Sequence, residues 1–199
     1  MTKSELRNIY LEKRSALSPV ECSEASRGIA ERFFETFDLA AVRTLHCFIP
    51  IARFNEIDTS LIYERVWRDH PQIRTTAPRV DRASGEIQNV VFSLDTELSA
   101  NAWGIREPGH GDLVDALEID LVIVPLLCFD KSGHRIGYGK GFYDKLLSRC
   151  RPDCLKIGVS YFPPIDRIVD AGPHDVPINV CVTPDEVFEF SMAKDADPR

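Results

Sequence analysis

Four glycines lie close together in the second half of the chain, at positions 133, 137, 139 and 141. Two basic side chains, Arg135 and Lys140, stand among them, and Asp144 follows shortly after. Glycine lets the backbone adopt positive φ and lets a ligand approach the amide N–H groups. The pattern favours a phosphate-binding loop at the start of a helix, with an aspartate close enough to hold a metal ion.

The spacing of these glycines excludes two familiar nucleotide-binding loops. A GxGxxG dinucleotide motif needs glycine at position 142, where this chain has Phe142. No Gly-Lys is followed by Ser or Thr, so the segment is not a P-loop either. A tight strand-to-helix turn without any ligand would explain the glycines about as well. The basic residues and Asp144 favour the phosphate interpretation.

Three basic residues near the start of the chain could lie on one helix face. Lys3 and Arg7 are four positions apart, and Arg14 follows seven positions later. Residues with this spacing share one side of an α-helix. Such a stripe is most often a solvated surface, and binding of nucleotide phosphates is the alternative.

Two further candidates stand outside the glycine loop. Glu56 lies between an expected strand end and an expected helix start, where helix capping would suit Asp58 and Thr59 better. Trp103 precedes a Gly-Ile-Arg-Glu-Pro segment. A lone tryptophan is either part of the core or a flat surface for an aromatic ligand.

The composition is that of an ordinary globular protein. The chain has 199 residues, of which 44% are hydrophobic and 28% charged, with a net charge of −7. No apolar run approaches the roughly 20 residues that cross a bilayer, and the N-terminus is charged, so we expect a cytoplasmic protein. Its acidity argues against nucleic acid as a partner, so any anion site must be local. Six scattered cysteines indicate reduced thiols.

The apolar patterns predict alternating helices and strands. Helices are expected over residues 1–40, with a capping box at Ser18 and Glu21, from Asp58 or Thr59 to Trp67, and from the glycine loop to about Cys150. Strands are expected over 44–50, 72–80, 86–94, 121–127, 156–161 and 180–182, the second and third joined by a turn and the sixth being the last. We therefore expect one α/β domain, residues 1–199, with a layered, largely parallel mixed sheet flanked by helices. The tail after residue 190 is expected to fray.

The glycine loop also carries a resemblance to a known family. RIGYGKGFYD, residues 135–144, resembles the Arg-Leu-Gly-x-Gly-x-Gly-Tyr-Tyr-Asp loop of the 5-formyltetrahydrofolate cyclo-ligase family, with conservative changes at Ile136 and Phe142. KSELR, FNEIDT, WGIREP, LVIVPLLCFD and HDVPINVCVT follow the family order as well. The likeness covers nearly the whole chain. It implies ATP- and Mg²⁺-dependent closure of 5-formyltetrahydrofolate to 5,10-methenyltetrahydrofolate, with release of ADP and phosphate.

The resemblance also implies roles for individual residues. ATP would contact Lys3, Ser4, Glu5, Leu6, Arg7, Arg135, Ile136, Gly137, Tyr138, Gly139, Lys140, Gly141, Phe142 and Tyr143. The folate would contact Ile51, Glu56, Trp103, Tyr138, Gly139, Lys140, Gly141 and Phe142, and Mg²⁺ would be held by Asp144 and Asp175. Lys140 and Arg135 are the expected catalytic cations. Positions 138 and 140 vary within the family, so their individual contacts stay open.

Under this reading the partners are small molecules, with no nucleic acid or membrane, and the protein is a monomer. Two alternatives belong to other functional classes. One is a folate- or nucleotide-binding module that has lost turnover, although Lys140, Asp144 and Asp175 are all present. The other is a sugar-phosphate isomerase-like enzyme, which would need no ATP.

Overall fold

The computed structural model describes residues 1–81, 86–101 and 104–190. Within them, a sheet of eight strands has the order β12-β11-β10-β7-β1-β2-β3-β6. Its five middle strands are parallel: β11 (Val180–Val182), β10 (Leu155–Val159), β7 (Leu121–Pro125), β1 (Thr44–Cys47) and β2 (Arg74–Val80). At the two ends β12 (Val187–Glu189), β3 (Ile87–Val91) and β6 (Leu113–Val114) pair antiparallel. The predicted mixed, largely parallel α/β sheet is confirmed.

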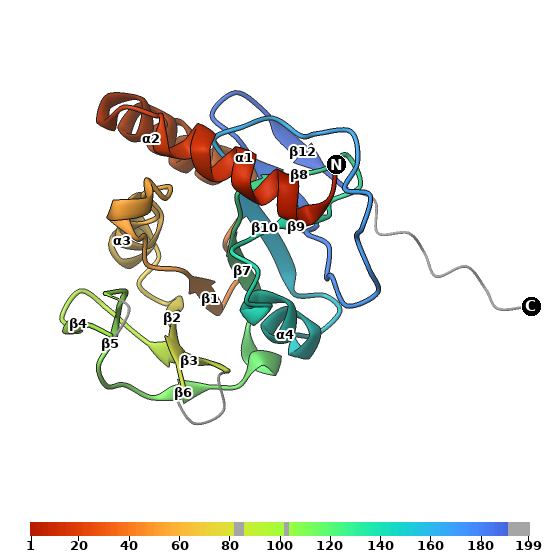
Figure 1. Ribbon diagram of the computed structural model, residues 1–199. Coiled ribbons are helices and arrows are strands. Elements are labelled where there is room, and N and C mark those ends of the chain that lie inside the picture. The colour runs from red at the N-terminus through yellow and green to blue at the C-terminus, as the bar shows by residue number, and fades with distance from the viewer. Residues whose placement is uncertain (82–85, 102–103, 191–199) are drawn as a thin grey trace, which may run out of the picture.

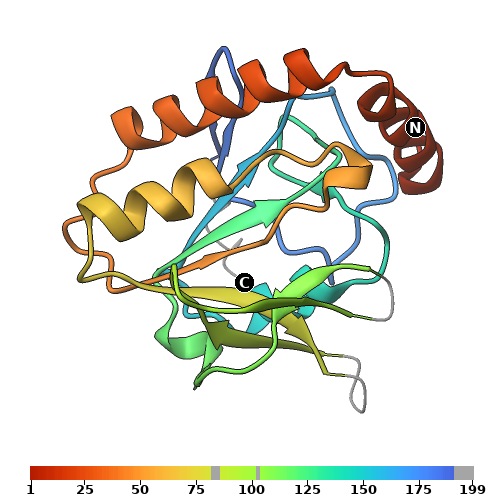
Figure 2. The ribbon, with the colours of Figure 1, turned by 90° about the vertical axis from the view of Figure 1, so that its left-hand side faces the viewer.

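Helices cover both faces of this sheet (Figure 1). On one face, α2 (Pro19–Thr36) and α3 (Ser60–Asp69) run side by side, as Figure 2 shows, and bury Phe33 and Val66 against strand residues such as Ile123. On the other face, α4 (Phe142–Arg149) buries Leu146 and Leu147. Because both faces are covered, β7 can be apolar throughout, which is typical of a central parallel strand.

The first helix, α1 (Lys3–Ser15), packs outside this layer. Its apolar residues Leu6 and Tyr10 form a separate buried cluster with Cys128 and Ile136. These partners belong to the small antiparallel pair of β8 (Cys128–Phe129) and β9 (Arg135–Ile136), which leads into the glycine loop. The helix that carries the N-terminal cations is therefore anchored directly beside that loop.

The remaining elements are short. Two 3₁₀ turns, η1 (Ala52–Phe54) and η2 (Ala116–Glu118), follow β1 and precede β7. A second two-stranded sheet joins β4 (Leu98–Ala100) and β5 (Arg106–Pro108). None of the helices in residues 1–81, 86–101 and 104–190 is both long and apolar enough to cross a membrane.

Local contacts explain why most predicted elements form where expected. Ser18 and Glu21 make both hydrogen bonds of the capping box that starts α2. At α3, the Asp58 carboxylate accepts from the Ser60 N–H at 3.1 Å. The Thr59 hydroxyl instead donates to the Phe48 carbonyl at 2.6 Å, which ties the helix start to the end of β1.

One prediction about the end of the sheet is wrong. The strand at Val180–Val182 is not the last, because a tight turn returns the chain as β12. In that turn the Thr183 N–H donates to the Glu186 carbonyl at 2.9 Å, and the Glu186 N–H donates to the Thr183 hydroxyl at 3.0 Å. The turn predicted after β2, Trp103 and the tail after residue 190 lie wholly or mostly outside the described residues.

The strand order creates a crevice at one edge of the sheet. From β1 the chain moves through α3 to β2 on one side, whereas from β7 it moves through α4 to β10 on the other. The loops that follow β1 and β7 therefore diverge. In open α/β sheets ligands bind at the carboxyl ends of strands where the order switches in this way.

Candidate active site

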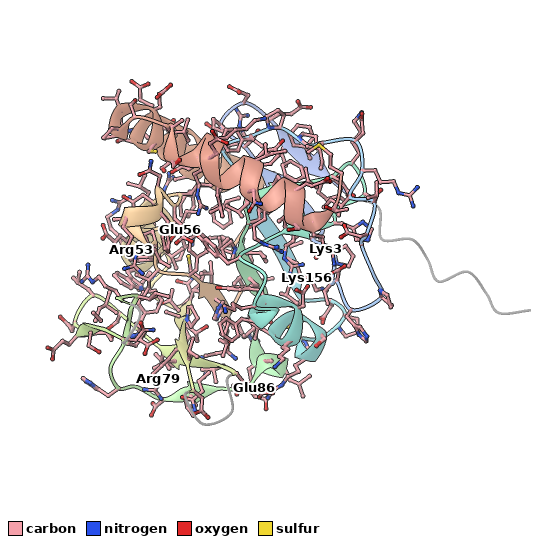
Figure 3. The ribbon with its side chains drawn as sticks, in the orientation of Figure 1. Lys3, Arg53, Glu56, Arg79, Glu86 and Lys156 are labelled. Atoms are coloured by element: carbon pink, nitrogen blue, oxygen red, sulfur yellow. The ribbon has the colours of Figure 1, made fainter. Side chains whose placement is uncertain are left out.

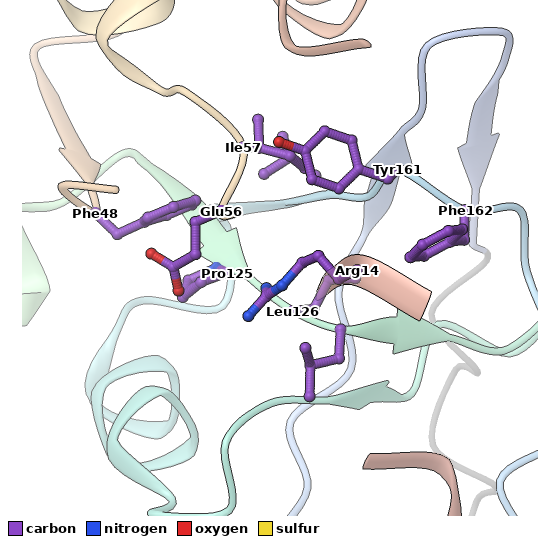
Figure 4. A pocket seen from close by; sticks show the side chains of 10 residues that line it. Arg14, Phe48, Glu56, Ile57, Pro125, Leu126, Tyr161 and Phe162 are labelled. Carbon is purple, nitrogen blue, oxygen red and sulfur yellow. The ribbon is translucent and has the colours of Figure 1, made fainter. Parts of the chain in front are cut away.

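A small pocket lies at this switch point (Figure 4). The chain after β1, the end of β7 and the chain after β10 all contribute walls, and α1 adds one side chain. Its lining is formed by Arg14, Phe48, Glu56, Ile57, Pro125, Leu126, Leu127, Val159, Tyr161 and Phe162. Apolar and aromatic walls surround one cation and one carboxylate, and the cavity between them measures about 10 Å³, the room of one water molecule. A flat ligand would therefore enter only if the lining side chains moved apart.

Glu56 is held at the mouth of this pocket by two hydrogen bonds. Its Oε2 accepts from the Ile51 backbone N–H at 2.7 Å, and its Oε1 accepts from the Tyr138 hydroxyl at 2.6 Å. Burial raises the pKa of the Glu56 carboxyl, and the two hydrogen bonds oppose that rise. The structure thus brings together Ile51, Glu56 and Tyr138, three of the residues predicted to hold the substrate.

Tyr138 connects this pocket with the glycine loop. Its hydroxyl accepts a hydrogen bond from the guanidinium of Arg14 while donating to Glu56. Its ring lies 5.8 Å from the ring of Phe54. Arg7 and Arg14 both contact the glycine loop, so the predicted shared face holds for them, whereas the solvated-surface interpretation is wrong for Arg14. Arg14 is 5% exposed and faces the pocket rather than solvent.

Arg7 and Lys3, the other two cations of the predicted stripe, meet the glycine loop and the segment before β11. Arg7 Nε donates to the Gly137 carbonyl at 3.0 Å, and Lys3, labelled in Figure 3, forms an ion pair with Asp175. Gly139 has φ of +86°, and a Cβ there would stand 3.0 Å from Arg7 Cζ. Glycine is thus required at 139 both by the backbone and by the neighbouring guanidinium.

Lys140 is the exposed cation of the loop. Within residues 1–81, 86–101 and 104–190 its ammonium has no hydrogen bond or ion pair. The next residue, Gly141, adopts φ of +68° and begins α4, whose first-turn N–H groups and helix dipole favour an anion. An unpaired ammonium beside these amides can bind a phosphate.

Arg135 points the other way. Only 5% of its side chain is exposed, and its guanidinium donates to the Val176 carbonyl and to Asp144 Oδ1, the latter at 2.9 Å. Burial lowers the pKa of this guanidinium, and Asp144 opposes the shift. The predicted ATP-contacting residues Leu6 and Ile136 also have buried side chains, which pack in one apolar cluster. The geometry favours a positioning role for Arg135.

Asp144 and Asp175, the two predicted Mg²⁺ ligands, both contact the backbone of the segment at 172–176. The Val176 N–H donates to Asp144 Oδ1 at 3.1 Å, and the Gly172 N–H donates to Asp175 Oδ2 at 2.6 Å. In the part of the chain that the structure describes, no group of three or more His, Cys, Asp and Glu side chains could hold a metal. Mg²⁺ usually takes one or two carboxylates together with phosphate oxygens and water, so two aspartates beside the glycine loop would fit it if that loop bound a phosphate.

A buried polar chain behind the loop was missed by the sequence analysis. His46, in the centre of β1, has Nε2 3.4 Å from the Tyr143 hydroxyl and Nδ1 3.1 Å from the Thr76 hydroxyl. Burial lowers the pKa of His46 to about 3, so the imidazole is neutral at physiological pH. Tyr143, the second residue of α4, is thereby anchored to the sheet. The sequence signal that could have indicated this buried chain is a histidine within a short apolar strand.

The pocket walls were also not foreseen individually. Phe48, Tyr161 and Phe162 follow the ends of β1 and β10. Ligands of open α/β sheets bind at such strand ends, so these residues could be picked out only once the strand order was known. Trp103, predicted as a pterin contact, lies outside the described residues.

Comparisons with known proteins agree with one another. The model of the 5-formyltetrahydrofolate cyclo-ligase family matches residues 1–184. A 5-formyltetrahydrofolate cyclo-ligase of Mycoplasma genitalium is 52% identical over 164 residues, covering 80% of this chain and 84% of that protein. The Escherichia coli K12 enzyme of the same name is 26% identical, covering 90% and 98%. An NMR structure of Aquifex aeolicus 5,10-methenyltetrahydrofolate synthetase has a TM-score of 0.82 and 30% identity, covering 100% of this chain and 98% of its own.

Proposed function

Because the chain belongs to the 5-formyltetrahydrofolate cyclo-ligase family, we propose that it closes 5-formyltetrahydrofolate to 5,10-methenyltetrahydrofolate while ATP becomes ADP and phosphate. One observation of the structure supports this proposal above others. Tyr138 belongs to the glycine loop, yet its hydroxyl reaches Glu56 in the switch-point pocket. A phosphate on the loop and a pterin in the pocket would therefore be neighbours.

The reaction explains why ATP is needed. The oxygen of the N5-formyl group is a poor leaving group, because without phosphorylation it would have to depart as hydroxide, and resonance in the formamide makes the carbon a weak electrophile. In the proposed sequence that oxygen attacks the γ-phosphorus and ADP leaves, which gives an iminium phosphate. N10 then bonds to the formyl carbon, the carbon–oxygen bond breaks, phosphate departs and the N10 proton passes to water. In phosphoryl transfer of this kind the protein mainly aligns the attacking oxygen with the γ-phosphorus and stabilises the charge on the phosphate.

The residues around the loop suit these tasks. Lys140 would bind the transferring phosphate, and Lys3, Arg7 and the loop amides would hold the rest of the triphosphate. Arg135 would act through Asp144, which it keeps beside the segment at 175–176. Asp144 and Asp175 would hold Mg²⁺, which supplies neutralisation of phosphate charge when bound.

The pocket suits the pterin half of the substrate. Its aromatic and aliphatic walls would cover the flat ring, and Glu56 would accept hydrogen bonds from the ring's amino and N–H groups. Fixing the ring in this way orients N10 toward the formyl carbon, an effect that contributes strongly to ring closure.

Replacing Asp144 with asparagine tests the metal assignment. We expect the Mg²⁺ concentration for half-maximal turnover to rise at least about fivefold, because an amide oxygen lacks the charge that Mg²⁺ prefers. A magnesium titration of initial rates measures this. Asp166→Asn is the matched control, since Asp166 is exposed and, among the residues that the structure describes, its carboxylate pairs with Lys131 alone. An Asp144→Asn titration that coincides with the parent protein's would remove Asp144 from the metal site.

Omission of ATP separates the proposal from its alternatives. Accumulation of 5,10-methenyltetrahydrofolate, followed by its absorbance, is expected with ATP and Mg²⁺ and not without ATP. A binding module would produce none under either condition, and an isomerase-like enzyme would turn over a sugar phosphate with no ATP present. A cytoplasmic location and a monomeric state stay predictions.

A further inference from the structure

Arg14 is a buried cation whose hydrogen bonds are incomplete. The residue is 5% exposed, and its Nε has no hydrogen-bond partner. Among the described residues no carboxylate lies within ion-pair distance of its guanidinium, which donates to the Tyr138 hydroxyl. A buried charge without full hydrogen bonding lowers the stability of the folded protein, so Arg14 is not explained by stability alone. The unused donor points to an acceptor that comes from outside the chain.

Hydrogen bonds from Asn55 hold the backbone at Arg14 in place. The Asn55 side-chain amide donates to the backbone carbonyls of Arg14 and Leu17, each at 3.1 Å. Asn55 immediately precedes Glu56, so this contact ties the end of α1 to the loop that carries the carboxylate. Figure 4 shows the Arg14 and Glu56 side chains extending toward one another across the pocket. A ligand edge placed between them meets a guanidinium and a carboxylate together.

The Tyr138 hydroxyl indicates which chemical groups of a ligand Arg14 and Glu56 can bind. It donates to Glu56 and accepts from Arg14, so a donor and an acceptor lie side by side. The 2-amino-4-oxopyrimidine ring of a folate has the same pattern on one edge: the 2-amino group and N3–H donate, and the adjacent O4 accepts. Tyr138 lies between Gly137 and Gly139, and 37% of it is exposed, so its hydroxyl can give up this place to a ligand.

We propose that Arg14 donates to the 4-oxo group of the pterin while Glu56 accepts from N3–H and the 2-amino group, so that Arg14 determines specificity for 4-oxo folates. The proposal rests on the proposed function and deepens it. O4 and the N5-formyl group are neighbours on the pteridine ring. A guanidinium bound to O4 therefore also fixes where the formyl oxygen stands relative to the glycine loop.

The test compares 5-formyltetrahydrofolate with its 4-amino-4-deoxy analogue, in which a donor replaces the O4 acceptor and N3 loses its hydrogen, so the difference between protein variants is what reports on Arg14. Equilibrium binding of both compounds is measured by calorimetry on the full chain. The parent protein is expected to prefer the 4-oxo compound at least about tenfold, since two facing donors cannot bond. In Arg14→Met the ratio of the two affinities is expected to fall at least about tenfold, because methionine neither donates nor repels the amino group.

Lys13→Met is the matched control, because Lys13 is the neighbouring cation on α1, is exposed and lies over the ring of Tyr10. It should leave the ratio unchanged. An unchanged ratio in Arg14→Met, or equal affinity of the parent protein for the two compounds, would overturn the proposal. Equal affinity of the parent protein for the two compounds overturns the proposal even if Arg14→Met fails to fold. Absence of ATP-dependent cyclisation in the parent protein would instead overturn the proposed function, so the two failures are distinguishable.

Discussion

Replacing Lys140 with alanine should lower kcat at least about 100-fold, because it removes the exposed ammonium that is expected to stabilise charge on the transferring phosphate. The side chain has no partner in residues 1–81, 86–101 and 104–190 that its removal would leave unsatisfied. The folded structure should therefore be unaffected. Initial rates of methenyltetrahydrofolate formation at saturating ATP and folate measure the effect.

Lys145→Ala provides the control for this loss of charge. Lys145 is also exposed, lies on the same helix α4, and its side chain has no hydrogen bond among the described residues. It should keep parent-like kcat. If Lys140→Ala also turned over at the parent rate, Lys140 would have no role in phosphoryl transfer. Thermal unfolding of both variants shows whether either has lost stability.

Replacing Glu56 with glutamine or alanine should lower kcat/KM for 5-formyltetrahydrofolate by about 10- to 100-fold. A hydrogen bond to a charged group contributes about 1.5–3 kcal/mol, which corresponds to that range. The KM for ATP should change less than twofold, because Glu56 lines the pocket and, among the described residues, contacts the glycine loop only through the Tyr138 hydroxyl. Equal weakening of folate and ATP would contradict a substrate-binding role and indicate a folding defect.

The same carboxyl predicts a pH dependence. Burial raises the pKa of Glu56, so its charged form is lost at a higher pH than that of an exposed glutamate. Folate affinity in the parent protein should therefore decrease as the pH falls toward this raised pKa. In Glu56→Gln that decrease should disappear, whereas Glu64→Ala, at an exposed position on α3, should retain it.

Local signals predicted most of the fold. The capping box at Ser18 and Glu21, the fully apolar strand at 121–125 and the alternation of helices with strands each depend on neighbouring residues, so they are visible in the sequence. The strand order is not local. It is the position of β7 beside β1 that creates the crevice, and no spacing along the chain specifies it.

Arg14 and Arg135, which differ from expectation, show in the same way that contacts between residues distant in the sequence are not visible in it. Helical spacing groups Arg14 with Lys3 and Arg7, but Asn55 and Tyr138, 41 and 124 positions away, enclose it. Arg135 belongs to the basic glycine loop by sequence, yet the carbonyl of Val176 and the carboxylate of Asp144 draw its side chain inward. Long-range packing decides whether a cation faces a ligand or the interior.

The fate of the formyl oxygen is the most direct test of the central claim that ATP activates this atom. 5-Formyltetrahydrofolate labelled with ¹⁸O in the formyl group is converted with ATP and Mg²⁺, and the released phosphate is analysed by mass spectrometry. We predict that each phosphate carries one ¹⁸O from the formyl group, because the carbon–oxygen bond breaks after the oxygen has bonded to phosphorus. Unlabelled phosphate, with the label found in water, would contradict the account.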